Sequence, residues 1–270
     1  MLWKLLKHEM SAMGRVMLPI WGALLLLSVF VSLTDLLLGQ VEGVIAGLAT
    51  GMLFALFVTG CMAASVVAVI MMILRFQKSV LSREGYLTHT LPVNVHQLVW
   101  SRVLTASIYM AATMLVIGGC FLIAIARTGM VREMLDVFVM MWQDIITNAP
   151  LHVVLYMVEF ILMIVVAELA SCLMFYAALS IGHSFANHKI LLSVVFYFVL
   201  YTGTQIVSMI LMIVIVAVNI PELVMHMDTA EQMFRYTHTV MLSVGLLYLI
   251  YCTVYYLLTT GMLKRRLNLQ

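Results

Sequence analysis

Six apolar runs, each long enough to cross a lipid bilayer, constrain this chain more than any other feature of its sequence. A membrane-spanning helix needs about 20 consecutive apolar residues. The runs lie near residues 17–38, 45–74, 99–126, 151–181, 189–218 and 237–262. Because lipid offers the backbone no hydrogen-bonding partner, a spanning segment must satisfy its own amide groups, as a helix does. We therefore expect an all-α integral membrane protein with six transmembrane helices, forming one transmembrane domain over residues 1–270.

The composition excludes an ordinary soluble domain. Hydrophobic residues make up 64% of the 270 residues and charged residues 10%, whereas a soluble domain carries about 25% charged residues. The four cysteines all fall inside apolar runs, and no C-x-x-C pair occurs. We interpret them as small buried side chains, because neither a disulfide framework nor a zinc site has this pattern.

The distribution of Lys and Arg predicts the orientation, since these residues accumulate in the short cytoplasmic loops of membrane proteins. With both termini in the cytoplasm, three of the 14 cations lie outside, namely Arg127, Arg132 and Arg235. The eleven on the inside are Lys4, Lys7, Arg15, Arg75, Lys78, Arg83, Arg102, Lys189, Lys264, Arg265 and Arg266. We therefore expect a multi-pass protein with cytoplasmic termini, because the reverse orientation would place the eleven outside.

Residues 1–15 precede the first apolar run and are amphipathic. Trp3, Leu6, Met10 and Met13 recur at steps of three and four, which places them on one face of a helix. Trp and Lys are typical of the membrane–water interface, so this segment favours an interfacial helix. The alternative is that it is the start of the first span. The stretch 131–147 alternates apolar and acidic residues, and we expect a second interfacial helix there, on the outside.

The most polar segment between two long apolar runs covers residues 75–92. Gly85 and Pro92 delimit a short helix within it, because both residues interrupt helical structure. Tyr86, Leu87 and Leu91 give this helix an apolar surface suited to docking on another protein. The run RFQKSVLSREGYLTHTLP (75–92) resembles the first cytoplasmic loop of bacterial ABC type-2 exporter permeases.

A second segment supports the same resemblance. ALSIGHSFANHKIL (178–191) looks like the inner end of the fourth span in that family, and residues 1–15 match its connecting helix. The resemblance implies a permease of the bacterial plasma membrane whose loop 76–98 is a cytoplasmic coupling loop. It implies that the coupling helix contacts an ATP-binding subunit through Glu84, Gly85, Tyr86, Leu87, Thr88 and Leu91.

No phosphate-binding loop of the type G-x-x-x-x-G-K-[ST] occurs, and no glycine is followed by lysine. We therefore expect no ATPase activity in this chain by itself, with ATP and Mg bound by a separate subunit. The expected partners are two ATP-binding subunits, a second permease copy (identical or similar) and membrane lipid, with no nucleic acid. We expect no cofactor or metal on this chain. The Met-His-Met-Asp run at 225–228 could suggest a soft metal, but clustering by chance is easy in a chain with 24 methionines.

Two carboxylates and a polar face are the candidates for a translocation path. Glu159 and Glu168 lie inside the fourth apolar run, where an ionisable group costs roughly 2.5–3.5 kcal/mol and tends to face a cavity or a partner. Their spacing places them about 180° apart on a helix, which disfavours a carboxylate pair. In the fifth run, Thr204, Gln205 and Ser208 need protein or water as partners. The alternative for all five is a structural contact between helices.

Gly43, Gly47 and Gly51 form two overlapping G-x-x-x-G units at the start of the second run, a spacing that favours close packing of helices. The partner helix can belong to the same protomer or to another.

The sequence thus predicts the transmembrane permease subunit of an ATP-driven ABC exporter with a hydrophobic or amphipathic substrate. A second hypothesis is a proton-coupled secondary transporter that uses Glu159 or Glu168, although neither inverted repeats nor broken spans are evident. A third, an intramembrane enzyme, is disfavoured because no H-E-x-x-H, G-x-S-x-G or paired-carboxylate motif occurs.

Overall fold

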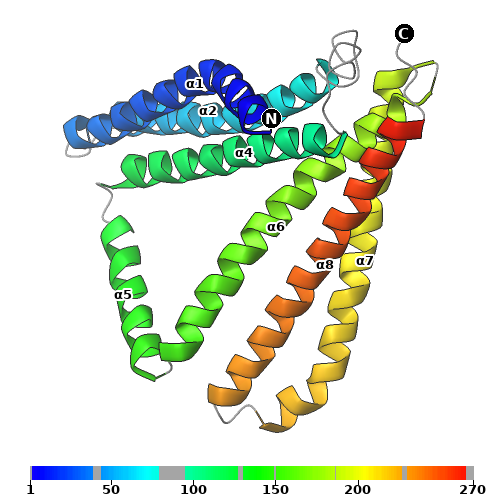
Figure 1. Ribbon diagram of the computed structural model, residues 1–270. Coiled ribbons are helices and arrows are strands. Elements are labelled where there is room, and N and C mark those ends of the chain that lie inside the picture. The colour runs from blue at the N-terminus through cyan, green and yellow to red at the C-terminus, as the bar shows by residue number, and fades with distance from the viewer. Residues whose placement is uncertain are drawn as a thin grey trace. The chain divides into compact units, whose positions relative to one another are not determined.

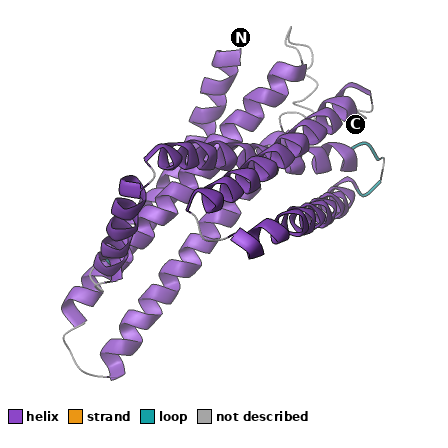
Figure 2. Ribbon diagram, turned by 90° about the horizontal axis from the view of Figure 1, so that it is seen from below, coloured by secondary structure: helices purple, strands orange, loops and turns teal. Residues whose placement is uncertain are grey.

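A computed structural model of the chain consists of long helices (Figure 1). It describes residues 2–38, 44–78, 95–126, 130–148, 150–185, 187–226 and 230–265. The helices in these ranges are α1 (Leu2–Leu38), α2 (Val44–Phe76), α4 (Val95–Ile125), α5 (Met130–Asn148), α6 (Pro150–Gly182), α7 (Lys189–His226) and α8 (Ala230–Arg265). Within the described residues, helix is the one regular secondary structure (Figure 2).

Six of these helices are long and apolar enough to cross a membrane. Their candidate spans are Leu6–Thr34, Val44–Phe76, Val95–Ile125, Val154–Gly182, Lys189–Val218 and Phe234–Lys264. The predicted fold class, all-α with six membrane-spanning helices, is confirmed. The spans have 29 to 33 residues, which exceeds the roughly 20 needed to cross the hydrocarbon, so they must tilt or project from it.

The first helix differs from the sequence prediction in its extent. A separate helix was expected over residues 1–15, whereas α1 runs without a break from Leu2 to Leu38. Pro19 lies inside α1 and has no N–H to donate to the carbonyl of Arg15. This loses one bond of the helical ladder while the remaining bonds continue. An interfacial position for residues 1–15 and for α5, which matches the predicted helix at 131–147, stays a prediction.

Two compact units divide the chain. The first comprises Met1–Leu74 and Leu104–Asn148, and the second comprises Arg75–Val103 and Ala149–Gln270. Two of the three boundaries between the units fall inside helices, in α2 and in α4, and the third lies between α5 and α6. The end of α2 and the beginning of α4 therefore belong to the same unit as α6, α7 and α8.

An apolar core holds the first unit together. Its buried residues come from α1, α2 and α4 and are Leu24, Val31, Phe57, Ala64, Cys120 and Ala124. Two hydrogen bonds join α1 to α4 beside this core. Trp21 Nε1 donates to Thr113 Oγ1 over 3.2 Å, and the Tyr109 hydroxyl donates to the carbonyl of Met10 over 2.7 Å.

Helix α6 is the centre of the second unit, because it packs against both α8 and α7. Its C-terminal half is the most buried part, and Tyr176 is 2% exposed there. The Phe76 ring at the end of α2 stacks on Tyr176 with centroids 4.0 Å apart. The Tyr176 hydroxyl donates to the carbonyl of Arg102 in α4 over 3.4 Å. The segments on either side of residues 79–94 are thus both anchored on α6.

A tight turn joins α6 to α7. The amides of His183, Ser184 and Phe185 bond to carbonyls three or four residues back and so close the last turn of α6. His188 has a φ of 54°, in the left-handed region. A Cβ on Gly182 would collide with the backbone nitrogen and Cα of Ser193 at the start of α7. Glycine at position 182 therefore allows the two helices to approach this closely.

Candidate functional site

The structure places the five candidate translocation residues on two helices. Glu159 and Glu168 lie in α6, and Thr204, Gln205 and Ser208 lie in α7. The six predicted coupling residues, Glu84, Gly85, Tyr86, Leu87, Thr88 and Leu91, lie outside the described residues.

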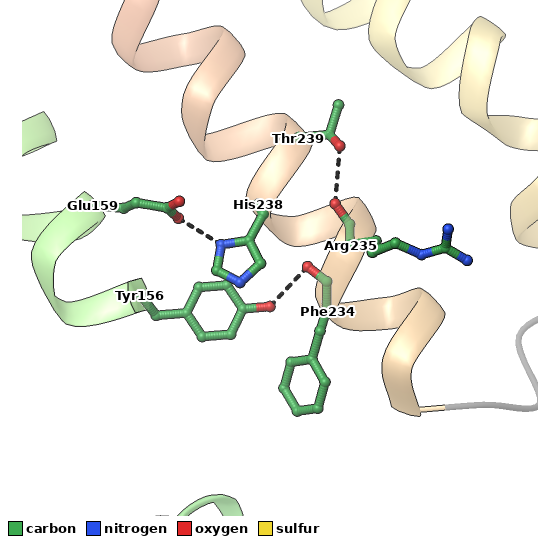
Figure 3. A network of polar contacts seen from close by, with 6 residues as sticks. All are labelled: Tyr156, Glu159, Phe234, Arg235, His238 and Thr239. Carbon is green, nitrogen blue, oxygen red and sulfur yellow. Dashed lines mark hydrogen bonds and ion pairs between the residues drawn. The ribbon is translucent and has the colours of Figure 1, made fainter. Parts of the chain in front are cut away.

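Glu159 pairs with a histidine of the last helix (Figure 3). His238 Nδ1 lies 2.8 Å from Glu159 Oε2, and the two side chains are 16% and 17% exposed. A carboxylate accepts hydrogen bonds and cannot donate them, so Nδ1 carries the hydrogen of this bond.

Tyr156 fixes the position of the His238 ring. The two rings stack with centroids 4.2 Å apart and an interplanar angle of 19°. The Tyr156 hydroxyl donates to the carbonyl of Phe234 over 3.0 Å, which ties α6 to α8 a second time. In Figure 3 the Arg235 side chain points away from Glu159. His238 is therefore the hydrogen-bonding partner of this carboxylate, in the cluster that we call the Glu159 cluster (Tyr156, Glu159, Phe234 and His238).

Glu168 has different surroundings from Glu159. It lies nine residues further along α6, which is roughly 13.5 Å along the helix axis and on the opposite face. Its Oε1 atom is buried and has no hydrogen-bond partner among the described residues. The two carboxylates are thus not brought together, and each must be considered as a separate site.

Thr204 and Ser208 meet the third helix of the unit through Tyr251 of α8. The Tyr251 hydroxyl donates to the carbonyl of Thr204 over 3.1 Å. It therefore accepts the bond from Ser208 Oγ, 3.2 Å away. The Thr204 hydroxyl bonds within its own helix, to the carbonyls of Leu200 and Tyr201. Thr204 and Ser208 thus take part in contacts between α7 and α8, whereas Gln205 is exposed.

His238 does not stand out in the sequence as the partner of Glu159. The signal was present, because an ionisable side chain near the start of the sixth apolar run requires a partner or water. Neither the helical period nor the spacing along the chain shows that this partner is 79 residues away. Tyr251 likewise gives no sign in the sequence of the hydrogen bonds that connect it to α7.

His183 lies just beyond the end of α6 and contacts the end of α2. His183 Nδ1 donates to the carbonyl of Leu179 over 2.9 Å, so Nε2 accepts from Gln77 Nε2, 3.4 Å away. Burial lowers the pKa of His183, and the nearby charge of Lys189 lowers it further, although the bond to Leu179 opposes this. The neutral imidazole is thus the form that this position favours.

Comparisons of the chain with protein-family models, with curated proteins and with solved structures found no match.

Proposed function

We propose that this chain is the transmembrane permease subunit of an ATP-driven ABC exporter in a bacterial plasma membrane, with both termini cytoplasmic. The observation that carries the proposal is the anchoring of the segments on either side of residues 79–94. Phe76 precedes this stretch and stacks on Tyr176, and Arg102 follows it and accepts the Tyr176 hydroxyl bond. A loop that transmits force needs such a stiff base. The six candidate spans supply the membrane part.

In this proposal the loop 76–98 docks on a separate ATP-binding subunit through the apolar side chains of Tyr86, Leu87 and Leu91. Closure of two ATP-binding subunits on ATP pushes the loop, and the force reaches α6 through the stacked rings of Phe76 and Tyr176. Helices α7 and α8 follow, because both pack on α6. The substrate is hydrophobic or amphipathic, and the path runs beside Glu159, Glu168, Thr204, Gln205 and Ser208.

A second permease copy completes the proposed assembly, and the glycines of α2 support it. A Cβ on Gly47 or on Gly51 would meet no atom within 4 Å. The G-x-x-x-G spacing favours close contact with another helix, and neither glycine has such a contact among the described residues of this protomer. A helix of the second copy is the proposed partner.

The test is to purify the tagged chain from the membranes of its own host and identify what accompanies it. We expect an ATP-binding subunit with a phosphate-binding loop, present in equal numbers, and ATP hydrolysis by the complex. Tyr86→Ala with Leu87→Ala should weaken the association about tenfold or more, since burying each side chain contributes roughly 1.5–3 kcal/mol. Normal association and normal substrate-stimulated hydrolysis in this double variant would remove the main ground for the proposal.

A proton-coupled secondary transporter is the second candidate, and the Glu159 cluster is the observation that favours it. In this candidate, the largely buried pair of Glu159 and His238 is the site at which the coupled proton binds. Transport by the chain alone in liposomes, driven by a pH gradient and stopped by a protonophore, would support this candidate. The ABC proposal instead requires ATP and the partner subunit, and expects at most one of Glu159→Gln and Glu168→Gln to abolish transport.

A further inference from the structure

A second polar cluster of the α6–α8 unit lies at the other end of α8 from the Glu159 cluster. It joins the start of α4 to the end of α8 through His96, Trp100, Tyr256 and Lys264, and we call it the Lys264 cluster. Lys264 Nζ lies 2.9 Å from His96 Nε2, and His96 Nδ1 contacts the Tyr256 hydroxyl. The Trp100 ring lies 5.6 Å from the Tyr256 ring.

The hydrogen-bonding chemistry of the Lys264 cluster leaves donors for a ligand. A lysine ammonium can only donate, so His96 Nε2 accepts from Lys264 and His96 Nδ1 carries the ring hydrogen. The Tyr256 oxygen then accepts from Nδ1, and its own O–H remains to be donated. Two further N–H bonds of Lys264 and the Trp100 indole N–H are donors as well. No carboxylate of the described residues pairs with Lys264.

The cluster is exposed at the point where two spans end. The candidate spans begin at Val95 and end at Lys264, so the four side chains lie at one boundary of the apolar region. Lys264 and His96 are exposed, and Trp100 is 38% exposed. Tryptophan, tyrosine and lysine are the residues that anchor helices at the level of lipid headgroups.

An apolar stripe continues from Lys264 along the same face of α8. The stripe consists of Ile250, Val254 and Leu257. Successive steps of four, three and seven residues lead from Ile250 through these positions to Lys264, so all four side chains share one side of the helix. The three apolar side chains are 48%, 44% and 61% exposed. From Ile250 to Lys264 the helix rises roughly 21 Å, which exceeds the roughly 15 Å depth of one hydrocarbon leaflet.

We propose that the Lys264 cluster binds the phosphate of an anionic phospholipid, with one acyl chain of that lipid lying along the stripe of Ile250, Val254 and Leu257. The donors of Lys264, Tyr256 and Trp100 match the acceptor oxygens of a phosphodiester. The stripe distinguishes a lipid from a free phosphate, because a free phosphate has no apolar part that could contact these side chains. It also distinguishes a lipid from an acidic segment of a partner protein, which would contact the charged end of α8 and leave the stripe uncovered. Basic sites of this kind between helices bind anionic headgroups in membrane proteins.

The test measures how strongly the purified full-length chain retains phosphatidylglycerol, relative to phosphatidylcholine, by native mass spectrometry after release from mixed nanodiscs. We expect Lys264→Ala and Tyr256→Phe each to lower the preference for phosphatidylglycerol, the former on the order of tenfold. Lys264→Arg should restore it, because the charge is kept. Lys7→Ala is the matched control, since it removes an exposed lysine from α1 and should leave the preference unchanged.

Two parallel arms separate the sources of phosphate. Excess inorganic phosphate and excess glycerol 1-phosphate should fail to displace phosphatidylglycerol, because neither occupies the stripe, and Leu257→Asn should weaken retention of the lipid. Displacement by either soluble phosphate, together with no effect of Leu257→Asn, would overturn the lipid in favour of a free phosphate. The site itself would be overturned if Lys7→Ala lowered the preference for phosphatidylglycerol as much as Lys264→Ala does, or if the wild type showed no such preference. Tyr256→Phe keeps the aromatic ring near Trp100. Its circular dichroism spectrum should match that of the wild type, which shows that a folded chain is being compared.

Discussion

The two compact units of this protein hold their helices together by different interactions. In the first unit, α1, α2 and α4 meet mainly over apolar side chains such as Leu24, Phe57 and Cys120, and two hydrogen bonds join α1 to α4 beside them. In the second, α6, α7 and α8 are joined by directional contacts: the pair of Glu159 and His238, and the Tyr251 hydroxyl between α7 and α8.

This difference indicates in which unit the helices are fixed in register relative to one another. Lipid tails are as apolar as leucine, so helices in a membrane associate through close packing and hydrogen bonds. Apolar packing accepts side chains of similar volume with little loss. A hydrogen bond or an ion pair holds two particular atoms together, and shifting one helix by a single turn breaks it. In the second unit directional contacts join α8 to both α6 and α7, so a small change of position there alters specific contacts.

The largest expected effect breaks the apolar unit by removing volume. Phe57 is fully buried and its ring lies near those of Phe54 and Phe121. Phe57→Ala should lower the free energy of unfolding by about 3–5 kcal/mol, whereas Phe57→Leu should cost less, because it leaves a smaller cavity. Unfolding in mixed micelles measures both. Equal losses in the two variants would mean that shape, and not volume, decides the packing of this unit.

The next effect breaks the close approach of α6 and α7. Gly182→Ala adds a methyl group that collides with the backbone of Ser193, and backbone cannot rotate away as a side chain does. We expect a loss of about 1–3 kcal/mol in the free energy of unfolding. Gly118→Ala in α4 is the control, because a Cβ there meets no atom within 4 Å. A Gly182→Ala chain as stable as Gly118→Ala would show that the turn relaxes freely.

A smaller effect sharpens the comparison at the Glu159 cluster. Glu159→Gln keeps an oxygen that accepts from His238 Nδ1 but removes the charge, and His238→Gln removes the imidazole. A double-mutant cycle of the two should give a coupling free energy of about 1–2 kcal/mol, within the range for polar contacts in membrane helices. The substitutions Trp21→Phe and Thr113→Val in the first unit provide a matched double-mutant cycle at the hydrogen bond between α1 and α4. A larger coupling there would reverse the contrast between the units.

The smallest effect is a pH dependence at His183, just beyond the end of α6. Because burial lowers the pKa of His183, the unfolded chain binds a proton there more readily than the folded chain. Stability is therefore lost as the pH falls below the ordinary histidine pKa of about 6.5. Melting temperatures at about pH 7.5 and about pH 5.5 should differ less in His183→Gln than in the wild type. His8→Gln, at an exposed position of α1, should leave the difference as it is.

The sequence by itself determined the number and the type of the elements. Six apolar runs of sufficient length allow little other than six helices, because only a helix satisfies the backbone of a single segment in lipid. It also identified Glu159 and Glu168 as groups in need of an explanation, since a charge in an apolar run costs free energy. The ends of the helices did not follow from the apolar runs alone. Helix α1 begins at Leu2, ahead of the predicted span, because an amphipathic segment can continue into an apolar one within a single helix.

The tertiary structure decided which faces of the helices meet. A helix that is apolar on all sides shows no periodicity that separates a protein-facing side from a lipid-facing one. The sequence therefore cannot tell that His238 faces Glu159 from 79 residues away, while Glu168 leaves an oxygen buried without a hydrogen bond among the described residues. It cannot show that the Phe76 ring stacks on Tyr176. These pairings depend on how distant helices pack, since each segment alone is equally stable with any of its faces turned to lipid.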